Sequence, residues 1–359
     1  MDAAHDPGTR LLMIGPMPPP LNGQSEVMRH VVARIGPHFP RLRVEDVGAG
    51  GTSGRLGALA RAARSIVAWR SIRGSDAVYV AVKADNGMWL TTATVALVRL
   101  SGSTVFLHHH SYAYVGERKT RMVALAHVAG TDARHVVLSR SMAADLRRVM
   151  PEIRHTPVVG NAGLIDTSLL GLPLRADGGE LILGHLSNLS QQKGIAEVVD
   201  LACALRRSGT RARLVVGGPV ADDHARTHLH RAERELGDLF EYRGALTGPP
   251  KREFFGEITH FVFPSRYVHE ASPMVLYEAM ASGAVCIATR RGSICEQLAG
   301  SPALLARDHG CFVDETLPAL VGAVSSATAS RDTRRAYLRA LDESESQLAD
   351  LAAQFSRSD

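Results

Sequence analysis

The stretch Phe261–Gly283, FVFPSRYVHEASPMVLYEAMASG, decides the fold class of this chain. It reads as an apolar strand that ends in Pro-Ser, a loop that carries Glu270, and a helix that begins near Pro273 and carries Glu278. Proline is favoured in the first turn of a helix, because the first N–H groups there have no intrahelical acceptor. The pattern therefore predicts a strand–loop–helix unit of an α/β sheet, with both glutamates near its binding edge.

The start of this helix is expected to form a binding site. The backbone N–H groups of Ser272, Met274 and Val275 would lie at the positive end of the helix dipole, where anions and sugar hydroxyls bind. Glu270 and Glu278 could face the same crevice, and a carboxylate is well suited to accept hydrogen bonds from vicinal hydroxyls. The segment therefore predicts a site for an anion or for the hydroxyls of a ribose or hexose.

The remaining chain alternates between strand and helix patterns, which is typical of parallel α/β sheets. The expected strands are Leu11–Ile14, Ala77–Val82, Thr104–Leu107, His135–Leu138 and Thr156–Val159, then Glu180–Leu186, Arg213–Val216, Phe240–Arg243, Thr259–Phe263 and Val285–Thr289. The Gly- and Pro-rich stretch Gly171–Gly179 is the best linker. We therefore predict domains at 1–172 and 173–335, and a C-terminal helix at 336–359 that packs back toward the first domain.

Composition limits the classes of protein to be considered. The chain has 359 residues, 45% of them hydrophobic and 21% charged, which suits a soluble protein with two cores. Residues 1–172 carry 20 Lys and Arg against 12 Asp and Glu, whereas residues 173–359 carry 21 against 24. A basic first half favours an anionic partner, although an arginine-rich composition is an alternative explanation. Nucleic acid is the least favoured partner, because basic and aromatic residues are not interleaved.

Several segments resemble, in order along the chain, the motifs of the retaining glycosyltransferases of family 4. The spacing Glu270-x7-Glu278 is the first resemblance, and the others are LLMIGPMPPPLNGQS, VVLSRSMAADL, VVGNAGLID, LSNLSQQKG, EYRGALT and GSICEQL. Members of that family have the GT-B fold. The resemblance thus implies two Rossmann-like domains whose parallel sheets face each other across an inter-domain cleft.

The resemblance also implies roles for single residues. Glu278 would bind the ribose hydroxyls of the donor, and Glu270 would contact the transferred sugar near the reacting centre. Lys193 would bind the donor diphosphate, because the departing nucleoside diphosphate needs a fixed cation. Gly23 would lie in the loop against the donor phosphates and the acceptor, and Gly244 in the segment that contacts the nucleobase.

The sequence departs from the family pattern at two neighbouring positions, and at the first of them Ser187 replaces the usual glycine. Asn188 stands where an arginine is common, so it can donate a hydrogen bond to the donor but brings no charge. Arg266 is a candidate to supply that charge. The alternatives are that Arg266 is an ordinary surface residue or that a single cation holds the diphosphate.

Three consecutive histidines, His108-His109-His110, follow the strand Thr104–Leu107. Neighbouring residues of an extended chain point in opposite directions, so the three cannot converge on one metal ion. The resemblance implies that His109, and nearly as well His110, contacts the donor sugar, while structural packing is the alternative. No Asp-x-Asp motif follows a strand, and we therefore expect an enzyme that needs neither metal nor another cofactor.

The resemblance implies transfer of a hexose-type sugar from a UDP- or GDP-sugar to a glycan or lipid-linked acceptor, in polysaccharide biosynthesis. Two alternatives remain: a nucleotide-sugar 2-epimerase of the same fold, and a non-catalytic nucleotide-sugar-binding protein. The segment Arg55–Arg73 interleaves arginines with apolar residues, so it could rest on an anionic membrane, or be an ordinary surface helix. No signal peptide or spanning segment is evident, which places the expected protein in the cytoplasm, at the inner face of the membrane.

Overall fold

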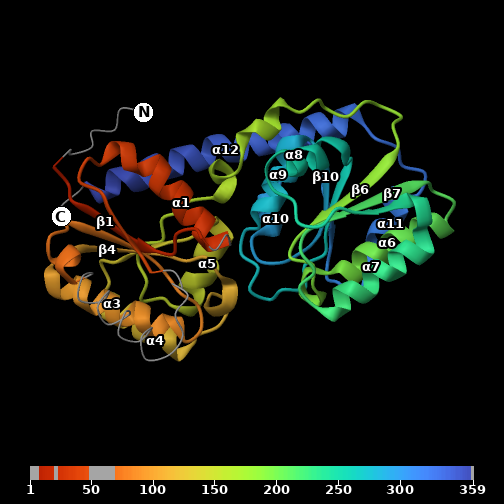
Figure 1. Ribbon diagram of the computed structural model, residues 1–359. Coiled ribbons are helices and arrows are strands. Elements are labelled where there is room, and N and C mark those ends of the chain that lie inside the picture. The colour runs from red at the N-terminus through yellow and green to blue at the C-terminus, as the bar shows by residue number, and fades with distance from the viewer. Residues whose placement is uncertain (1–7, 20–22, 48–68, 357–359) are drawn as a thin grey trace. The chain divides into compact units, whose positions relative to one another are not determined.

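The computed structural model describes residues 8–19, 23–47 and 69–356, which form two α/β units (Figure 1). The first unit comprises Met1–Leu164 together with Glu343–Asp359. The second comprises Ile165–Asp342. The two predicted parallel-sheet α/β domains are therefore present.

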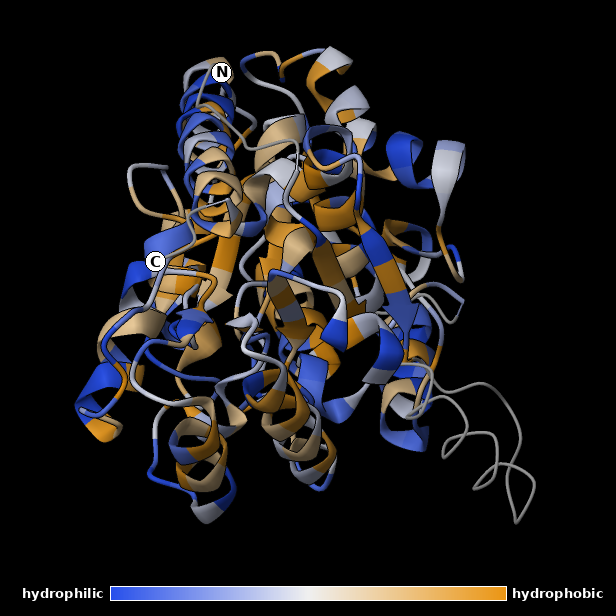
Figure 2. Cartoon of the chain, turned by 90° about the vertical axis from the view of Figure 1, so that its left-hand side faces the viewer, coloured by the Kyte–Doolittle hydropathy of each residue, from blue (hydrophilic) through white to orange (hydrophobic). Residues whose placement is uncertain are grey.

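The first unit contains a five-stranded parallel sheet in the order β2-β1-β3-β4-β5. Its strands are β1 (Leu11–Gly15), β2 (Arg43–Asp46), β3 (Ala77–Ala81), β4 (Thr104–His108) and β5 (Arg134–Val136). Its main helices are α1 (Gly23–Ile35), α3 (Gly87–Ser101), α4 (Thr120–Ala129) and α5 (Arg140–Val149). The apolar strands β1 and β3 are buried throughout, as expected of a parallel sheet covered on both faces. In Figure 2 most strands at the centre of the view are hydrophobic, and the hydrophilic residues lie mainly toward the outside.

The second unit contains a six-stranded parallel sheet in the order β11-β10-β9-β6-β7-β8. Its strands are β6 (Leu181–Leu186), β7 (Ala212–Gly217), β8 (Phe240–Tyr242), β9 (His260–Phe263), β10 (Val285–Thr289) and β11 (Leu304–Ala306). The connecting helices are α6 (Ile195–Arg207), α7 (Asp223–Leu236), α8 (Gly248–Glu257), α9 (Met274–Ser282), α10 (Ile294–Gln297) and α11 (Phe312–Leu320). The strand order reverses between β6 and β9, which is the point where open α/β sheets bind ligands.

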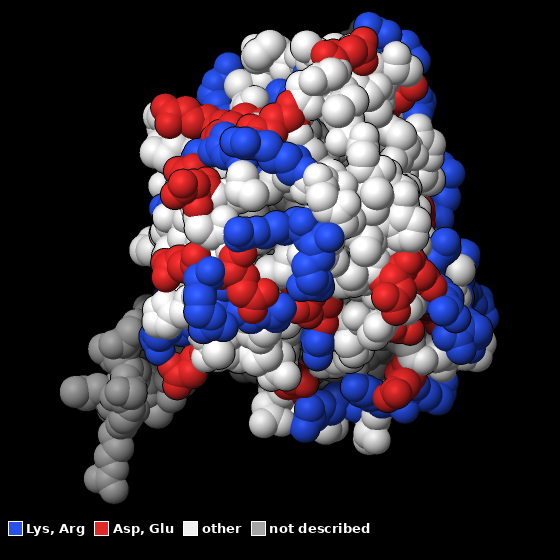
Figure 3. Space-filling view, turned by 90° about the vertical axis from the view of Figure 1, so that its right-hand side faces the viewer, with Lys and Arg blue, Asp and Glu red and all other residues white. Residues whose placement is uncertain are grey.

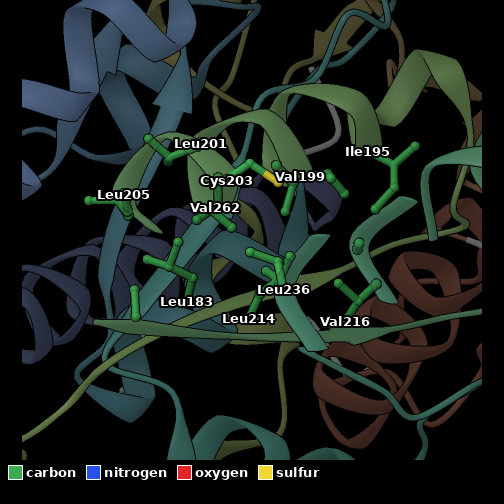
Figure 4. Packing of buried hydrophobic residues seen from close by; sticks show 14 of the residues in the cluster. Leu183, Ile195, Val199, Leu201, Cys203, Leu205, Leu214, Val216, Leu236 and Val262 are labelled. Carbon is green, nitrogen blue, oxygen red and sulfur yellow. The ribbon is translucent and has the colours of Figure 1, made fainter. Parts of the chain in front are cut away.

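A continuous apolar core lies between this sheet and helix α6. Leu183 and Leu214 of the strands are fully buried, as are Leu201 and Leu205 of the helix. Figure 4 shows these side chains pointing toward one another between the two elements. Burial of each such side chain contributes roughly 1.5–3 kcal/mol, so this packing holds the sheet that positions the site.

The sequence patterns gave wrong or missing elements at the edges of the two sheets. Residues 156–159, predicted as a strand, form only an isolated bridge between Val158 and Val137. In contrast, β2 was missed because Arg43–Asp46 is a polar and mostly exposed sequence, and its pairing with β1 comes from tertiary contact. β11 is short and half-buried, and it was missed as well.

The boundary between the units lies at 164/165 rather than at the predicted 172/173. The intervening residues are bound to the second unit, because Arg334 donates to the carbonyl of Leu172 at 2.8 Å and Arg252 donates to that of Ser168. Arg175, predicted to be linker, is buried and donates to the carbonyls of Phe255 and Ile258 at the end of α8. A cation at a helix C-terminus is favourable, which explains a buried arginine without an acid.

The last helix, α12 (Ala327–Phe355), begins earlier than predicted and contributes to both units. Tyr337 packs near Tyr277 of the second unit, with 6.4 Å between ring centroids. Beyond Asp342 the helix belongs to the first unit, where Phe355 contacts Phe106 of β4 with 4.4 Å between ring centroids. The C-terminal helix predicted at 336–359 is therefore the later part of a longer helix.

The exposed edge of the second sheet, at β8, is covered with charges of both signs. Arg243 pairs with Glu241 at 2.7 Å and with Glu257 at 2.5 Å, and Arg213 pairs with Glu257 at 2.9 Å. Figure 3 shows basic and acidic side chains interleaved over this face of the second unit. Charged side chains discourage edge-to-edge pairing, so this edge is protected against adding another strand.

Candidate functional site

The loops that follow β6 and β9 lie against each other at the carboxyl edge of the second sheet. The strands pair in parallel, with Leu183 opposite His260. Gly194 follows the loop after β6 and has φ +78°, and a Cβ there would lie 2.2 Å from the carbonyl oxygen of Pro264 after β9. Only glycine allows this approach, and it brings the side chains of the two loops together.

Glu270 and Lys193, predicted from separate motifs, form an ion pair. Lys193 Nζ lies 2.6 Å from Glu270 Oε2, and the Ser265 hydroxyl donates to the same oxygen at 2.9 Å. Glu270 is 8% exposed. Lys193 Nζ also lies 5.3 Å from the ring centroid of Tyr267, within cation–π range. The carboxylate is thus oriented by two donors in a buried position.

Glu278 has a lysine partner of its own. Lys251 Nζ on α8 lies 2.6 Å from Glu278 Oε1 on α9, and Glu278 is 7% exposed. The sequence analysis did not predict Lys251. The sequence signal for Lys251 is the scarcity of lysine. The chain has four lysines, and two of them pair with the two glutamates of the motif.

Helix α9 begins at Met274, with Pro273 as its N-cap residue. No side chain caps this end, and the Pro273 carbonyl accepts a hydrogen bond from Gln297 at 2.9 Å. The N–H groups of Met274 and Val275 have no acceptor within the helix, because they belong to its first turn. Ser272 is buried just before them. The predicted helix start is therefore present, in the same segment as Glu270.

The other predicted donor-binding residues of the second unit lie on loops at the same edge. Asn188 is exposed just after β6. Gly244 follows β8 with φ +65°, and its carbonyl accepts from the N–H of Gly218 at 2.6 Å. Arg266 instead forms an ion pair with Glu197, a buried residue of α6. The role of Arg266 in place of the arginine that is common at position 188 stays a prediction.

In the first unit, His109 is packed among other buried side chains, and its contact with the donor sugar stays a prediction. Its side chain is fully buried, with Nε2 3.0 Å from His135 Nδ1 and Nδ1 3.3 Å from the Tyr114 hydroxyl. Both ring nitrogens are thus occupied inside the unit, which is the packing alternative. His110 is half-buried at the end of β4, so it is the better placed of the two candidates.

Burial keeps the strand-end histidines neutral. The pKa of His110 is lowered to about 4, and that of His109 lies well below its ordinary value, in both cases because burial disfavours the charged ring. Among the described residues, no group of three or more His, Cys, Asp or Glu is placed to hold a metal ion. Gly23 lies exposed at the start of α1, and a Cβ there would meet nothing within 4 Å.

Comparison with known proteins places these features in context. Residues 173–336, which hold Lys193, Lys251, Glu270 and Glu278, match the family model described as Glycosyl transferases group 1. EpsF of Bacillus subtilis (strain 168), itself only provisionally assigned as a glycosyltransferase, is 28% identical over 159 residues. That match covers 44% of this chain and 39% of EpsF, so the chain spans less than half the length of this curated relative.

Solved structures extend the likeness to both units. HepE of Anabaena, solved in complex with UDP-glucose, has a TM-score of 0.70 and 14% identity, covering 96% of this chain and 99% of HepE. Sucrose-phosphate synthase from Thermosynechococcus elongatus has a TM-score of 0.69 and 17% identity, covering 96% and 98%. At these identities the likeness shows the fold, which is GT-B as predicted; membership of family 4 stays a prediction.

A pH-dependent stability follows from the buried histidines. Burial lowers the pKa of His135 to about 3, whereas an unfolded histidine has a pKa of about 6.5. The proton is therefore taken up on unfolding once the pH falls below 6.5. The free energy of unfolding should be unaffected above that pH and should fall by up to about 1.4 kcal/mol per buried histidine per pH unit below it. Urea unfolding between pH 8 and pH 5 measures this slope.

Two variants distinguish the effect of the buried His135 ring on this slope from that of an exposed histidine. His135→Gln should flatten the slope by about one proton. His127→Gln removes an exposed histidine and should leave the slope unchanged. Equal slopes for wild type and the His135 variant would contradict the assignment.

Lys251→Met should destabilise the second unit. The change leaves the Glu278 carboxylate buried beside an apolar group, which costs about 1–3 kcal/mol. Adding Glu278→Gln should recover part of this loss, because the two residues are coupled. Urea unfolding of both single variants and the double variant gives the coupling energy, with exposed Lys119→Met as the control. Purely additive effects would show that the contact contributes nothing.

Proposed function

We propose that this protein is a retaining, metal-independent glycosyltransferase that moves a hexose-type sugar from a UDP- or GDP-sugar to a glycan or lipid-linked acceptor. Polysaccharide biosynthesis is the setting that we propose for it. The observation that carries the proposal is the pair of buried glutamates, each bound to a lysine, beside the reversal point of the second sheet. The match of this same unit to the glycosyl transferases group 1 model supports it.

The chemistry of the donor fits the two ion pairs. A nucleoside diphosphate presents ribose hydroxyls and a diphosphate, and a carboxylate accepts from the first while an ammonium binds the second. In the proposed complex Glu278 accepts from the ribose, and Lys193 exchanges Glu270 for phosphate oxygens. Glu270, still held by Ser265, is then available to the hydroxyls of the sugar. HepE, a structural neighbour, binds UDP-glucose, which supports the choice of ligand class.

The proposed reaction is a displacement on one face of the sugar. The bond between the anomeric carbon and the leaving phosphate oxygen breaks, and a bond to the acceptor oxygen forms on the same side. The acceptor proton passes to the leaving nucleoside diphosphate. Lys193 and the first N–H groups of α9, at Met274 and Val275, would stabilise the charge that builds up on that phosphate.

A donor panel tests the proposal. UDP-, GDP- and ADP-sugars are added to the full chain, and the melting temperature identifies the donor; release of nucleoside diphosphate is then measured in the presence of a chelator. We expect a shift with a UDP- or GDP-sugar, and release without added metal. Glu278→Ala should weaken donor binding about tenfold or more, since a hydrogen bond to a charged group is worth about 1.5–3 kcal/mol. Lys193→Ala should chiefly lower turnover.

The outcomes separate the proposed function from its alternatives. Lys119→Ala, an exposed lysine of the first unit, is the matched control and should change neither quantity. Binding without release of nucleoside diphosphate would indicate a non-catalytic sensor, and conversion of the sugar without its transfer would indicate an epimerase. Unchanged binding and turnover in both site variants would overturn the site assignment.

Contact with an anionic membrane is a separate part of the proposal. No helix among the described residues is long and apolar enough to span a bilayer. The segment Arg55–Arg73 lies outside the described residues except for 69–73, which are helical and in which Ile72 is buried. If this segment rests on the inner face of the membrane, Arg61→Glu with Arg64→Glu and Arg70→Glu should weaken binding to anionic vesicles. Unchanged, salt-insensitive binding would favour the surface-helix alternative.

A further inference from the structure

Helix α7 carries two histidines whose rings lie against each other. His224 and His228 are four residues apart, so their side chains lie on one face of the helix, one turn apart. Their ring centroids are 4.5 Å apart, with an angle of 47° between the ring planes. Both side chains are half-buried, and α6 packs against α7 within the second unit (Figure 1). The backbone of a single helix therefore holds the two rings together.

Two acidic residues of α6 lie close to this pair. Burial lowers the pKa of His228, and the charges of Glu197 and Asp200 are near enough to oppose that shift. Asp200 is bound to Arg231, with 2.6 Å between its carboxylate oxygen and the guanidinium nitrogen. The neutral imidazole that burial favours is the form that binds metal ions.

Three buried polar atoms of this cluster have no hydrogen-bond partner among the described residues. They are Nε2 of His224, Nδ1 of His228 and Oε2 of Glu197. Glu197 is only 4% exposed, and its other carboxylate oxygen is the one that pairs with Arg266. Buried polar atoms in folded proteins are nearly always bonded, and a water molecule or an ion supplies the bond where the protein does not. The cluster is therefore built to hold a small polar species.

The chemistry of the three atoms selects the class of that species. A neutral imidazole offers a nitrogen lone pair, and a carboxylate oxygen is an acceptor. Imidazole pairs favour Zn²⁺, Cu²⁺ and Ni²⁺, whereas Mg²⁺ and Ca²⁺ favour sites made of oxygen atoms. Two histidines four residues apart on one helix face are also the spacing with which helices bind zinc.

We propose that His224 and His228 chelate a divalent transition-metal ion, and that Glu197 accepts a hydrogen bond from a water molecule on that ion. Only two side chains bind the ion directly, because no group of three His, Cys, Asp or Glu among the described residues is placed to do so. Water fills the remaining positions, which makes the site an open one. The ion takes no part in the proposed transfer of the sugar.

The site lies beside the loop that follows β6. Asp222, the N-cap residue of α7, accepts a hydrogen bond from the N–H of Gln191 at 3.0 Å. Arg266, which pairs with Glu197, donates its backbone N–H to the carbonyl of Gln192 at 2.8 Å. An ion that joins α7 to α6 through Glu197 therefore adds to the contacts that hold this loop, and binding should stabilise the second unit.

Calorimetric titration of the full chain, carrying no affinity tag, with Zn²⁺ at neutral pH tests the proposal. We expect one ion per chain. Either His224→Gln or His228→Gln should raise the Kd about tenfold or more, since loss of even an outer partner of a metal site costs about 10–100-fold. His230→Gln changes an exposed histidine of the same helix, and as the matched control it should leave the Kd unchanged. The melting temperature without metal shows whether each variant is folded.

A spectroscopic measurement counts the ligands directly. With Cu²⁺ as the probe, the electron spin echo modulation from imidazole nitrogens should show two histidines in the wild-type chain and in His230→Gln. It should show one histidine in each single site variant. If a site variant fails to fold, the wild-type copper spectrum decides, because a single coordinated imidazole there contradicts chelation by the pair.

The remaining outcomes also decide. Failure of the folded wild-type chain to bind Zn²⁺ overturns the proposal and leaves water as the partner of the buried atoms. Weak binding that is equal in wild type, both site variants and the control is adventitious, and it overturns the proposal as well. The titration uses no nucleotide sugar, so a failure of the proposed transferase function would leave its result unaffected.

Discussion

The parallel pairing of β6 with β9 is the constraint on which the candidate site depends. These strands are far apart in the chain but adjacent in the sheet, so the loops after them meet at one edge. The apolar core beneath, between the strands and α6, is buried and holds the sheet in place. Gly194 then permits the contact of the two loops, and Lys193 reaches Glu270 as a consequence.

The electrostatics of this edge explain how two buried carboxylates are tolerated. A buried charge is costly unless it is paired and hydrogen-bonded, and here each glutamate has its own lysine at 2.6 Å. The partners come from different elements, η5 (Gln191–Lys193) for Glu270 and α8 for Glu278. Each buried carboxylate of the site is therefore balanced by one ammonium group.

The buried polar residues of the first unit differ from those of the second because they are uncharged. Its strand-end histidines are buried as neutral rings that bond to tyrosines and to each other, which adds packing but no charge. Lys83, just after β3, is a half-buried cation at the carboxyl edge of that sheet. The two units thus share one architecture and place different charges at corresponding edges.

The sequence alone determined the alternation of strands and helices, because apolar runs of strand length separated by amphipathic stretches leave few other folds. Val285–Thr289 matches β10 to the residue, whereas polar β2 gave no apolar signal. The resemblance to the motifs of family 4 also singled out Glu270, Glu278 and Lys193. Only the tertiary structure decided which side chains the candidate residues contact. These partners are Lys251 for Glu278, Glu197 for Arg266, and His135 for His109. The reason is physical, since strand order and loop contact bring together residues whose distance in the chain carries no information about their distance in space.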